Sequence, residues 1–299
     1  MNYALKITGL KKNYGKKQAL KGLSITVPKN SVYGFVGENG AGKTTTFSIL
    51  GGFLHSSAGE FELQGKMGML PQDARFSAGR KIGEQLHMLA RLAGVPRAQA
   101  TAEVKRVLTI VELEDQIKLA VNKCSHGMYK RVGIAQALLG DPDILLFDEP
   151  TAGLDPKHAH DIRRLIESLS QAKTVVISSH NLAEIGQMCD HVGIIHQGEM
   201  RYEGPVSALT HQNSVLNLEL NQKPNLGVLK KLKGVKSTDW LEEKSLCHVE
   251  FDRNVLSVEE MNGKLLRHLL DEKIGIRSIT IGKSLEGEFL KQLKVKTKA

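Results

Sequence analysis

Cysteine and long apolar runs are scarce in this chain, and each scarcity excludes a class of protein. Among its 299 residues there are three cysteines, Cys124, Cys189 and Cys247, which are odd in number and far apart. That pattern argues against a disulfide framework and against a zinc site. No apolar run approaches the roughly 20 residues that a helix needs to cross a bilayer. The N-terminus lacks the apolar stretch of a secretory signal, so we expect a cytoplasmic protein.

The charge is unbalanced without being concentrated. The net charge is +9, and a basic surface can attract nucleic acid or anionic lipid. The basic residues are scattered, however, except in the tail 291–298. Because charge runs are more often solvated faces than binding arms, we expect no nucleic-acid partner.

Apolar strands alternate with helices over the first two thirds of the chain. Strands are predicted at 24–27, 32–36, 60–63, 66–70, 144–147 and 174–178, and helices at 45–50, 129–139 and 156–169. Asp155 followed by Pro156 is a strong start signal for the last of these helices. Residues 81–121 have helical spacing, broken near Pro96. Apolar strands that alternate with helices imply a parallel sheet covered on both faces.

The pattern changes near 207–214, where we place a domain boundary. Residues 1–210 form the first domain, with a helical subdomain at about 76–139, and residues 211–299 form the second. In the second domain, strands are predicted at 215–220, 235–240, 246–251 and 276–281, and helices at 226–232, 258–270 and 285–293. Ser257 and Glu260 form a capping box for the middle helix. The order βαββαβ predicts a small α+β domain of the ferredoxin-like type.

The segment Gly37-Glu38-Asn39-Gly40-Ala41-Gly42-Lys43-Thr44-Thr45, the phosphate loop, carries the phosphate-binding pattern in full. Its glycines let backbone N–H groups point at phosphates, and the helix that follows turns its positive end to the anion. Lys43 supplies a mobile positive charge for the β- and γ-phosphates, and the Thr44 hydroxyl is a Mg²⁺ ligand. A plain glycine turn is the alternative. The apolar strand before the loop and the helix after it favour an ATP site.

Two acids and a histidine follow apolar strands farther along the chain. Asp148 ends the strand 144–147, so its carboxylate should emerge beside the phosphate loop, where it can hold magnesium. Glu149 is next to it and can orient and deprotonate the attacking water. His180 follows the strand 174–178 and would donate a hydrogen bond to the γ-phosphate. Solvated turn acids and a structural histidine are the alternatives, but a phosphate loop upstream favours the catalytic interpretation.

These motifs, taken in order, resemble those of the nucleotide-binding subunits of ABC transporters over residues 4–205. Tyr14 resembles the aromatic that stacks on adenine, and Gln72 resembles the glutamine that links the γ-phosphate and metal to the membrane partner. The signature segment, 124–128, stands where that family has its signature motif. Asp155 ends a segment similar to the loop that crosses the dimer interface. The resemblance implies an α/β P-loop ATPase domain with a parallel sheet core, a β-rich flank and a helical subdomain.

The same resemblance implies partners and roles. Two chains would pair head to tail as a homodimer around two ATP molecules, and Ser125 and Gly127 of each would reach the other's γ-phosphate. Hydrolysis would drive a separate transmembrane permease, which would hold the ATPase at the cytoplasmic face of the membrane. The residues implied to bind ATP are Tyr14, Gly37, Glu38, Asn39, Gly40, Ala41, Gly42, Lys43, Thr44, Thr45, Ser125, Gly127 and Asp155. The implied catalytic residues are Glu149, His180, Gln72 and Lys43, and the implied Mg²⁺ ligands are Thr44, Gln72 and Asp148.

The chain departs from the family pattern in its signature segment. The usual form is Leu-Ser-Gly-Gly-Gln, and here Cys124, His126 and Met128 replace the Leu, the first Gly and the Gln. This form resembles the branch of multidrug, polysaccharide and ABC-2-type exporters. His126 would either add a pH-dependent charge near the γ-phosphate or face out of the site.

Two other segments bear on the comparison with the family. Gly65 leads almost directly into the strand 66–70, so the β-rich flank should be short. Residues 284–290 resemble the closing segment of ABC-2-type subunits. The second domain carries no chemical constellation, and it would support dimerisation, serve regulation, or be a packing module.

Three functions compete. The first is the energising subunit of a membrane exporter, whose permease must be a separate polypeptide. The second is a soluble ABC-type ATPase that acts on nucleic acid or ribosomes, which the single phosphate loop and the short segment 80–121 disfavour. The third is a non-hydrolysing sensor, which Lys43, Asp148, Glu149 and His180 argue against. The transported substrate does not follow from the sequence.

Overall fold

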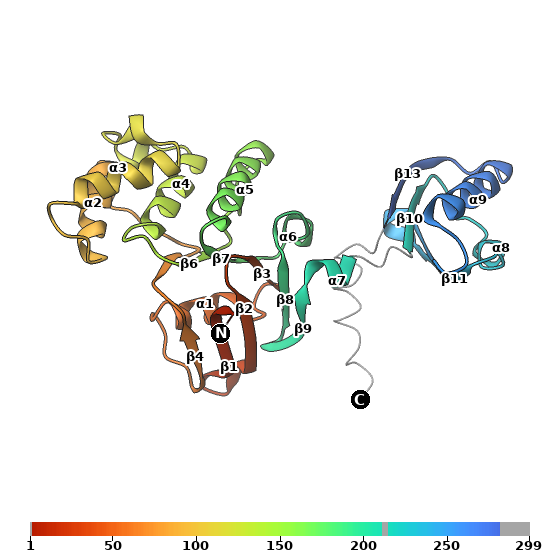
Figure 1. The fold of residues 1–299 in the computed structure, drawn as a ribbon, viewed down its shortest axis with the longest axis horizontal. Helices are drawn as coiled ribbons and strands as arrows, with labels where there is room; N and C mark the ends of the chain where they lie inside the picture. The colour runs from red at the N-terminus through yellow and green to blue at the C-terminus, as the bar shows by residue number, and fades with distance from the viewer. Residues whose placement is uncertain (1, 211–214, 282–299) are drawn as a thin grey trace. The chain divides into compact units, whose positions relative to one another are not determined.

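The computed structural model describes residues 2–210 and 215–281 (Figure 1). The chain divides into two compact units, residues 1–204 and 205–299. The predicted boundary between 210 and 211 lies later in the chain than this division, which assigns the short helix α7 (Val206–Thr210) to the second unit. Among the helices in the described ranges, none is both long and apolar enough to span a bilayer.

A six-stranded sheet forms the centre of the first unit, with the strand order β5-β6-β7-β3-β8-β9. Its strands are β5 (Met67–Leu70), β6 (Ile144–Asp148), β7 (Thr174–Ser179), β3 (Val32–Val36), β8 (His191–His196) and β9 (Glu199–Pro205). The pairs from β5 through to β8 are all parallel. Every residue of β3, β6 and β7 is buried, as expected for strands covered on both faces. The predicted parallel sheet is therefore present.

A smaller antiparallel sheet packs against the six-stranded sheet through helix α1 (Lys43–Leu50). It has the order β2-β1-β4 and consists of β1 (Tyr3–Tyr14), β2 (Lys17–Pro28) and β4 (Ala58–Leu63). Phe47 of α1 stacks on Phe35 of β3 with ring centroids 6.2 Å apart. Leu23 of β2 belongs to the same buried cluster. One hydrophobic core therefore holds both sheets and the helix that follows the phosphate loop.

Helices cover the rest of the first unit (Figure 1). Helices α2 (Ile82–Leu92), α3 (Ala100–Ile110) and α4 (His126–Ala137) pack together, and short 3₁₀ turns at Glu114–Gln116 and Val121–Lys123 connect α3 to α4. Helix α4 also packs on β5, α5 (Pro156–Ser170) on β7, and α6 (Leu182–Met188) on β3. Helix α4 begins earlier than the predicted residue 129, because the hydroxyl of Ser125 caps it by accepting the N–H of Met128.

The second unit is built on a four-stranded antiparallel sheet with the order β11-β12-β10-β13. Its elements are β10 (Val215–Leu220), α8 (Leu226–Leu229), β11 (Val235–Leu241), a 3₁₀ turn (Glu242–Lys244), β12 (Leu246–Phe251), α9 (Val258–Asp271) and β13 (Ile276–Ile281). Strands and α-helices thus follow the predicted order βαββαβ. The capping box of Ser257 and Glu260 is also present. The predicted helix 285–293 lies outside the described residues.

Strand β10 carries a buried polar residue, Asn217, which is 6% exposed. The Asn217 amide donates to the Thr280 hydroxyl at 3.4 Å, and its oxygen lies 2.5 Å from Nδ1 of His248. Cross-strand polar bonds therefore compensate the desolvation of this amide.

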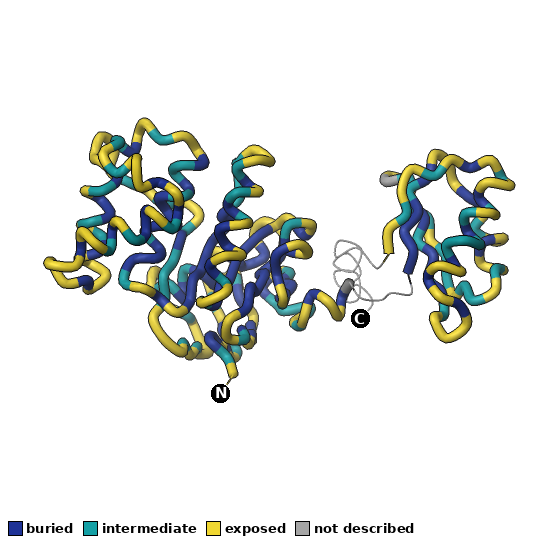
Figure 2. The backbone as a smooth tube through the Cα atoms, turned by 45° about the horizontal axis from the view of Figure 1, so that its top comes forward, coloured by how far each residue is buried: buried dark blue, intermediate teal, exposed yellow. Residues whose placement is uncertain are grey.

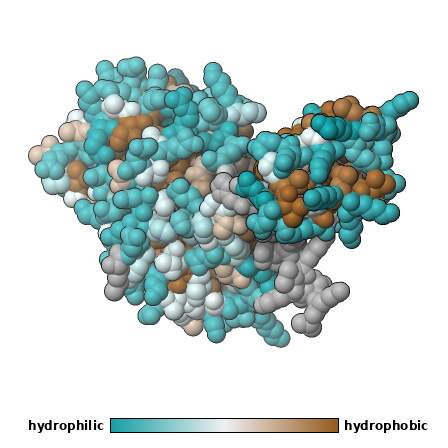
Figure 3. All heavy atoms as spheres, turned by 45° about the vertical axis from the view of Figure 1, so that its right-hand side comes forward, coloured by the Kyte–Doolittle hydropathy of each residue, from teal (hydrophilic) through white to brown (hydrophobic). Residues whose placement is uncertain are grey.

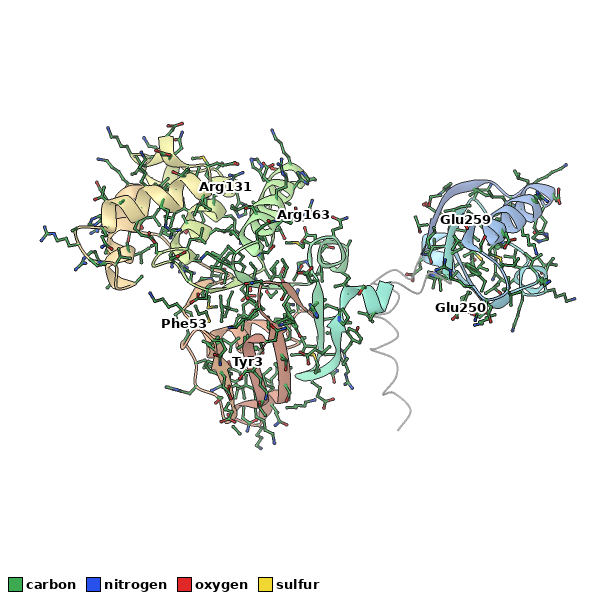
Figure 4. The ribbon with its side chains drawn as sticks, in the orientation of Figure 1. Tyr3, Phe53, Arg131, Arg163, Glu250 and Glu259 are labelled. Carbon is green, nitrogen blue, oxygen red and sulfur yellow. The ribbon has the colours of Figure 1, made fainter. Side chains whose placement is uncertain are left out.

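Burial is complete in the central strands β3, β6 and β7, and buried residues are the dark blue segments in Figure 2. Figure 3 shows one face of the molecule, where hydrophilic side chains predominate and hydrophobic ones form small patches. Exposed hydrophobic residues occur singly as well; Phe53 is 70% exposed and is labelled in Figure 4. Single exposed hydrophobic residues are ordinary for a soluble domain surface.

A glycine at the contact of β5 with α4 provides a test of this packing. A Cβ atom at Gly68 would collide with the backbone carbonyl oxygen of Ala137 in α4, which cannot rotate away. We expect Gly68→Ala to lower the free energy of unfolding of the first unit by about 1–3 kcal/mol, measured by urea denaturation. Gly133→Ala is the matched control, because its Cβ would meet only the side-chain end of Leu70, at 2.6 Å. A larger loss for Gly133→Ala would contradict the packing described.

Candidate nucleotide-binding site

The carboxyl ends of four parallel strands bring the predicted site residues to one edge of the central sheet. Strand β3 runs into the phosphate loop and β5 leads to Gln72. Strand β6 ends in Asp148, which Glu149 follows, and β7 leads to His180. Ligands of open α/β sheets bind at this edge, because the loops that connect the strands to the helices gather there.

The glycines of the phosphate loop meet two separate requirements. Gly40 and Gly42 have positive φ angles of 81° and 118°, a backbone region that strains other residues. Gly37 is needed for space, since a Cβ atom there would stand 2.5 Å from the carbonyl oxygen of Ile195. The backbone of the loop therefore passes close to β8 before α1 begins. No acidic side chain lies in the first turn of α1 to neutralise its positive end.

Lys43 is folded back into the phosphate loop. Its ammonium donates to the carbonyl oxygens of Gly37 at 2.7 Å and Glu38 at 3.3 Å. It also lies 3.6 Å from a carboxylate oxygen of Glu149, and both side chains are less than 10% exposed. The loop lysine and the predicted base thus form a buried ion pair across the site.

The two acids have different surroundings. Asp148 is 1% exposed and accepts a hydrogen bond from the hydroxyl of Ser178 on β7. Glu149 lies between two cationic or hydrogen-bonding groups, Lys43 and the ring of His180, whose Nδ1 is 2.9 Å from its carboxylate. The His180 side chain itself is 59% exposed. Both carboxylates are therefore buried, and they differ in their partners: a hydroxyl for Asp148, an ammonium and an imidazole for Glu149.

Two residues of the site were missed by the sequence analysis. Ser178 both donates to Asp148 and accepts the backbone N–H of Glu149, at 3.0 Å. Lys130 of α4 donates to the backbone carbonyl of Glu149 at 3.2 Å. Ser178 ends an apolar strand just before His180, which was a usable signal. Lys130 lies on a helix far from the strand ends in sequence, so only the packing of α4 reveals it.

The side-chain oxygens of Thr44, Gln72 and Asp148 are of the kinds that suit a magnesium ion. The Thr44 hydroxyl lies 3.5 Å from the side-chain oxygen of Gln72, which joins α1 to the segment after β5. Hydroxyl, amide and carboxylate oxygens are the donors that Mg²⁺ prefers, and it usually takes only one or two protein carboxylates together with phosphate oxygens. Within the described ranges, no group of three or more His, Cys, Asp or Glu residues could hold a metal by itself. The donor set therefore fits a magnesium ion that is shared with a nucleotide.

Tyr14 ends β1 and its side chain is half exposed. The ammonium of Lys12 lies 5.3 Å from the centroid of its ring and donates to the carbonyl of His55 at 2.8 Å. An exposed aromatic ring can stack on a base. The position of Tyr14 is compatible with its predicted role.

The signature segment contacts α5. Gly127 is buried, and a Cβ atom there would stand 2.7 Å from the ring of His158. His158 in turn lies 2.5 Å from the carboxylate of Asp155, which also accepts its backbone N–H at 3.0 Å and caps α5. The backbone hydrogen bond from His158 lowers the pKa of Asp155, and the ring adds to this effect. Asp155 and Gly127 are therefore joined through one histidine.

A cleft of about 460 Å³ borders the signature segment. Its walls come from the segment after β5, from the start of α4 and from the loop after Glu149; they include Gln72, Arg75, His126, Lys130 and Gly153. His126 is exposed, and a Cβ atom on Gly153 would stand 2.9 Å from its ring. The signature segment contacts α4, α5 and this loop, whereas Lys43 contacts Glu149 and Thr44 contacts Gln72.

A phosphate loop whose lysine meets a paired acid and a histidine at one sheet edge defines a P-loop nucleotide-binding ATPase. A family description of ABC transporters matches residues 20–152. The chain is 39% identical over 244 residues to the bacitracin transport ATP-binding protein BcrA of Bacillus licheniformis, an alignment that covers 77% of this chain and 79% of BcrA. It is 36% identical over 213 residues to the Nod factor export ATP-binding protein I of Burkholderia lata, with 67% and 70% coverage.

The solved structures agree. The structure of CbiO1 from Clostridium perfringens, part of the ABC transporter complex CbiONQ, superposes with a TM-score of 0.62 at 27% identity and covers 70% of this chain and 90% of that one. The chain belongs to the ABC transporter family and is an ATP-binding subunit with ATPase activity. The predicted resemblance and the predicted ATPase fold of the first unit are confirmed.

The buried pair of Lys43 and Glu149 provides a test of the site without nucleotide. Because removing Lys43 leaves the buried Glu149 carboxylate without its ammonium partner, we expect Lys43→Met to lower the free energy of unfolding of the first unit by about 3 kcal/mol. The double variant Lys43→Met/Glu149→Gln should recover most of this loss, since neither charge then remains. Urea denaturation of the wild type, both single variants and the double variant measures the coupling. Additive single effects would contradict a direct interaction.

Proposed function

We propose that this protein hydrolyses ATP to power export through a separate membrane-spanning subunit. One observation carries the catalytic part: Lys43, Asp148, Glu149 and His180, from α1 and two strands, meet at one sheet edge in a single network of contacts. The relatives named for bacitracin transport and Nod factor export support the transport part. The signature segment, with Met128 at its last position, resembles the form found in the exporter branch of the family.

Glu149 is the general base in this proposal. Its carboxylate accepts a proton from water as the water oxygen attacks the γ-phosphorus and the bond to the bridging oxygen of ADP breaks. His180, at 2.9 Å from that carboxylate, orients it and donates to the γ-phosphate. Lys43 exchanges its contact with Glu149 for the β- and γ-phosphates, which frees the carboxylate to act as a base. ATP binding therefore removes the cation that holds Glu149 in the free chain.

Thr44, Gln72 and Asp148 would hold Mg²⁺ at this site. When bound, the ion neutralises charge that develops on the phosphate oxygens. Ser178 keeps the Asp148 carboxylate at the sheet edge through its hydroxyl. Gln72, on the segment after β5, joins the metal ligands to the cleft beside α4. That cleft is a route by which the nucleotide state can reach a partner.

The complete site needs two chains in this proposal. Ser125 and Gly127 sit at the start of α4, where a hydroxyl, backbone N–H groups and the positive end of a helix suit a γ-phosphate. Ser125 is exposed, so its hydroxyl is available to the ATP of a second chain, whereas Gly127 is buried against His158 of its own chain. Asp155 and the loop before it would cross the interface. A head-to-tail homodimer with two ATP molecules follows.

The alternative function, a soluble ATPase that acts on nucleic acid or ribosomes, has no support among the relatives named above, which are transport subunits.

We further propose that the second unit supports dimerisation or regulates the ATPase. Its core is complete without the first unit, as Leu216, Val249, Met261 and Leu265 pack together. Deleting 212–299 should change dimerisation, ATPase rate or transport; a variant unchanged in all three would exclude this role.

The Glu149→Gln variant tests the base and the dimer together. We expect its ATPase kcat to fall at least about 100-fold, because the amide cannot take the proton. ATP affinity should persist, so the variant should accumulate as a dimer of twice 32.8 kDa in ATP, measured by light scattering. The same variant without nucleotide and the wild type with ADP are the monomeric controls. Rapid turnover would refute the base, and a monomer in ATP would refute the two-chain site.

The membrane partner has its own test. We expect the tagged chain, purified from detergent-solubilised membranes of its host, to retain a protein with several apolar spans of about 20 residues. Mass spectrometry identifies that partner. Retention of ribosomal proteins or nucleic acid in its place, with no membrane protein, would favour the soluble alternative.

A further inference from the structure

Helix α4 brings a second buried cation to the catalytic glutamate. Lys130 is 9% exposed, and its ammonium donates to the backbone carbonyl of Glu149 at 3.2 Å. Burial lowers the pKa of Lys130, and the charges of Asp148 and Glu149 oppose that shift. Lys43 pairs with the carboxylate of Glu149, whereas Lys130 donates to its backbone carbonyl. This contact with the main chain has no part in the chemical steps proposed above.

The main chain of Glu149 needs such a contact. Its φ is +51°, in the left-handed region that side chains rarely adopt. Residues in that region persist only where their surroundings hold them there. The N–H of Glu149 is held by Ser178, through the hydroxyl at 3.0 Å and the carbonyl at 3.3 Å. The carbonyl of Glu149 accepts the N–H of Ala152 at 3.2 Å, and among the described side chains Lys130 adds a second hydrogen bond to it, also at 3.2 Å.

Helix α4 links this contact to two other parts of the site. Its N-cap is Ser125, whose proposed ligand is the partner's γ-phosphate. Its Tyr129 hydroxyl donates to the carbonyl of Ala74 at 2.9 Å and accepts the N–H of Phe76 at 3.1 Å, on the segment after Gln72. Lys130 is the next residue. The start of α4 is therefore tied to the loops on both sides of the site in its own chain.

We propose that Lys130 is a positioning residue for hydrolysis: it holds the main chain of Glu149 and so couples the helix that serves the partner's ATP to the base of its own site. The inference rests on the proposed function, in which Glu149 is the base and Ser125 acts in the second chain. Loss of the Lys130 hydrogen bond leaves the carbonyl of Glu149 with the N–H of Ala152, loosens the peptide after Glu149 and lets the carboxylate leave its reactive position.

The neighbouring Arg131 is a matched control. It is labelled in Figure 4 on α4, and it also donates to a backbone carbonyl, that of Val111 at 2.8 Å. It pairs in addition with Glu112 at 2.7 Å. These contacts lie at the end of α3, away from Glu149. Arg131→Met therefore removes a partly buried cation from the same helix without touching the catalytic loop.

The first experiment compares Lys130→Met, Lys130→Arg and Arg131→Met by ATPase kinetics, ATP affinity and thermal unfolding. We expect Lys130→Met to lower kcat about 100-fold with ATP affinity within about threefold of the wild type. Lys130→Arg keeps a donor and should recover most of kcat. Arg131→Met should lower the unfolding temperature but leave kcat within about threefold of the wild type. Hydrogen exchange of residues 149–153 should be faster in Lys130→Met alone.

The second experiment uses mixed dimers, purified through two different tags, in which one chain carries Glu149→Gln and only the other has a base. Lys130→Met placed in the chain with the intact base should abolish the remaining activity. Placed in the Glu149→Gln chain, it should leave that activity unchanged, which also shows that the variant folds. Ser125→Ala should behave in the opposite way, because it acts on the partner's ATP.

The outcomes separate the inference from the proposal on which it rests. A kcat of Lys130→Met within about threefold of the wild type, beside an inactive Glu149→Gln, would overturn the positioning role alone. Loss of activity from Lys130→Met only in the Glu149→Gln chain would overturn it as well, since the effect would then run through the signature segment. An active Glu149→Gln would overturn the base, and with it the purpose of Lys130.

Discussion

The buried pair between Lys43 and Glu149 is the interaction on which the site depends. The two side chains lie far apart in the sequence, one at the start of α1 and one just after β6, and both are nearly inaccessible to water. Burying a charge costs free energy unless the charge is paired, so each of the two groups stabilises the buried position of the other. The pair also keeps the base occupied. Nucleotide phosphates compete for the same ammonium, which makes binding and activation one event in the proposed mechanism.

Around that pair, most of the structure serves to hold loops in positions that they would not adopt alone. Ser178 fixes both acids through one hydroxyl, and Lys130 holds the left-handed turn at Glu149 from the opposite side. His158 links Asp155 to the surface of Gly127. In this arrangement, the helix that begins at the signature segment is in contact with the catalytic loop, the segment after Gln72 and helix α5. In the proposed mechanism, a displacement of the first turn of α4 would reach Glu149 through Lys130.

The sequence was informative where a motif is local. The phosphate loop, the strand that ends in Asp148 and the helix start at Asp155 are each specified within a few residues by glycine geometry, apolar runs or capping chemistry. The order of elements in the second unit could be predicted for the same reason. Strands β1 and β9 were missed, because their mixed polar and apolar residues give weak local patterns. Strand β8 was missed although four of its six residues are buried; its parallel partner β3 lies far away in the chain. Lys130 and Ser178 were missed because their roles consist of contacts with residues far away in the chain.

By itself the sequence determined the chemical class of this protein: the residue types and spacings of the phosphate loop, the paired acids and the signature segment are sufficient to indicate an ATP site and its family. Only the tertiary structure decided how those groups meet. It brought Lys43 to the carboxylate of Glu149, put His158 between Asp155 and Gly127, and brought Lys130 to the backbone carbonyl of Glu149. The physical reason is that a motif fixes local backbone geometry and chemistry. Which distant side chain satisfies a buried carbonyl or carboxylate depends on how helices and strands pack together.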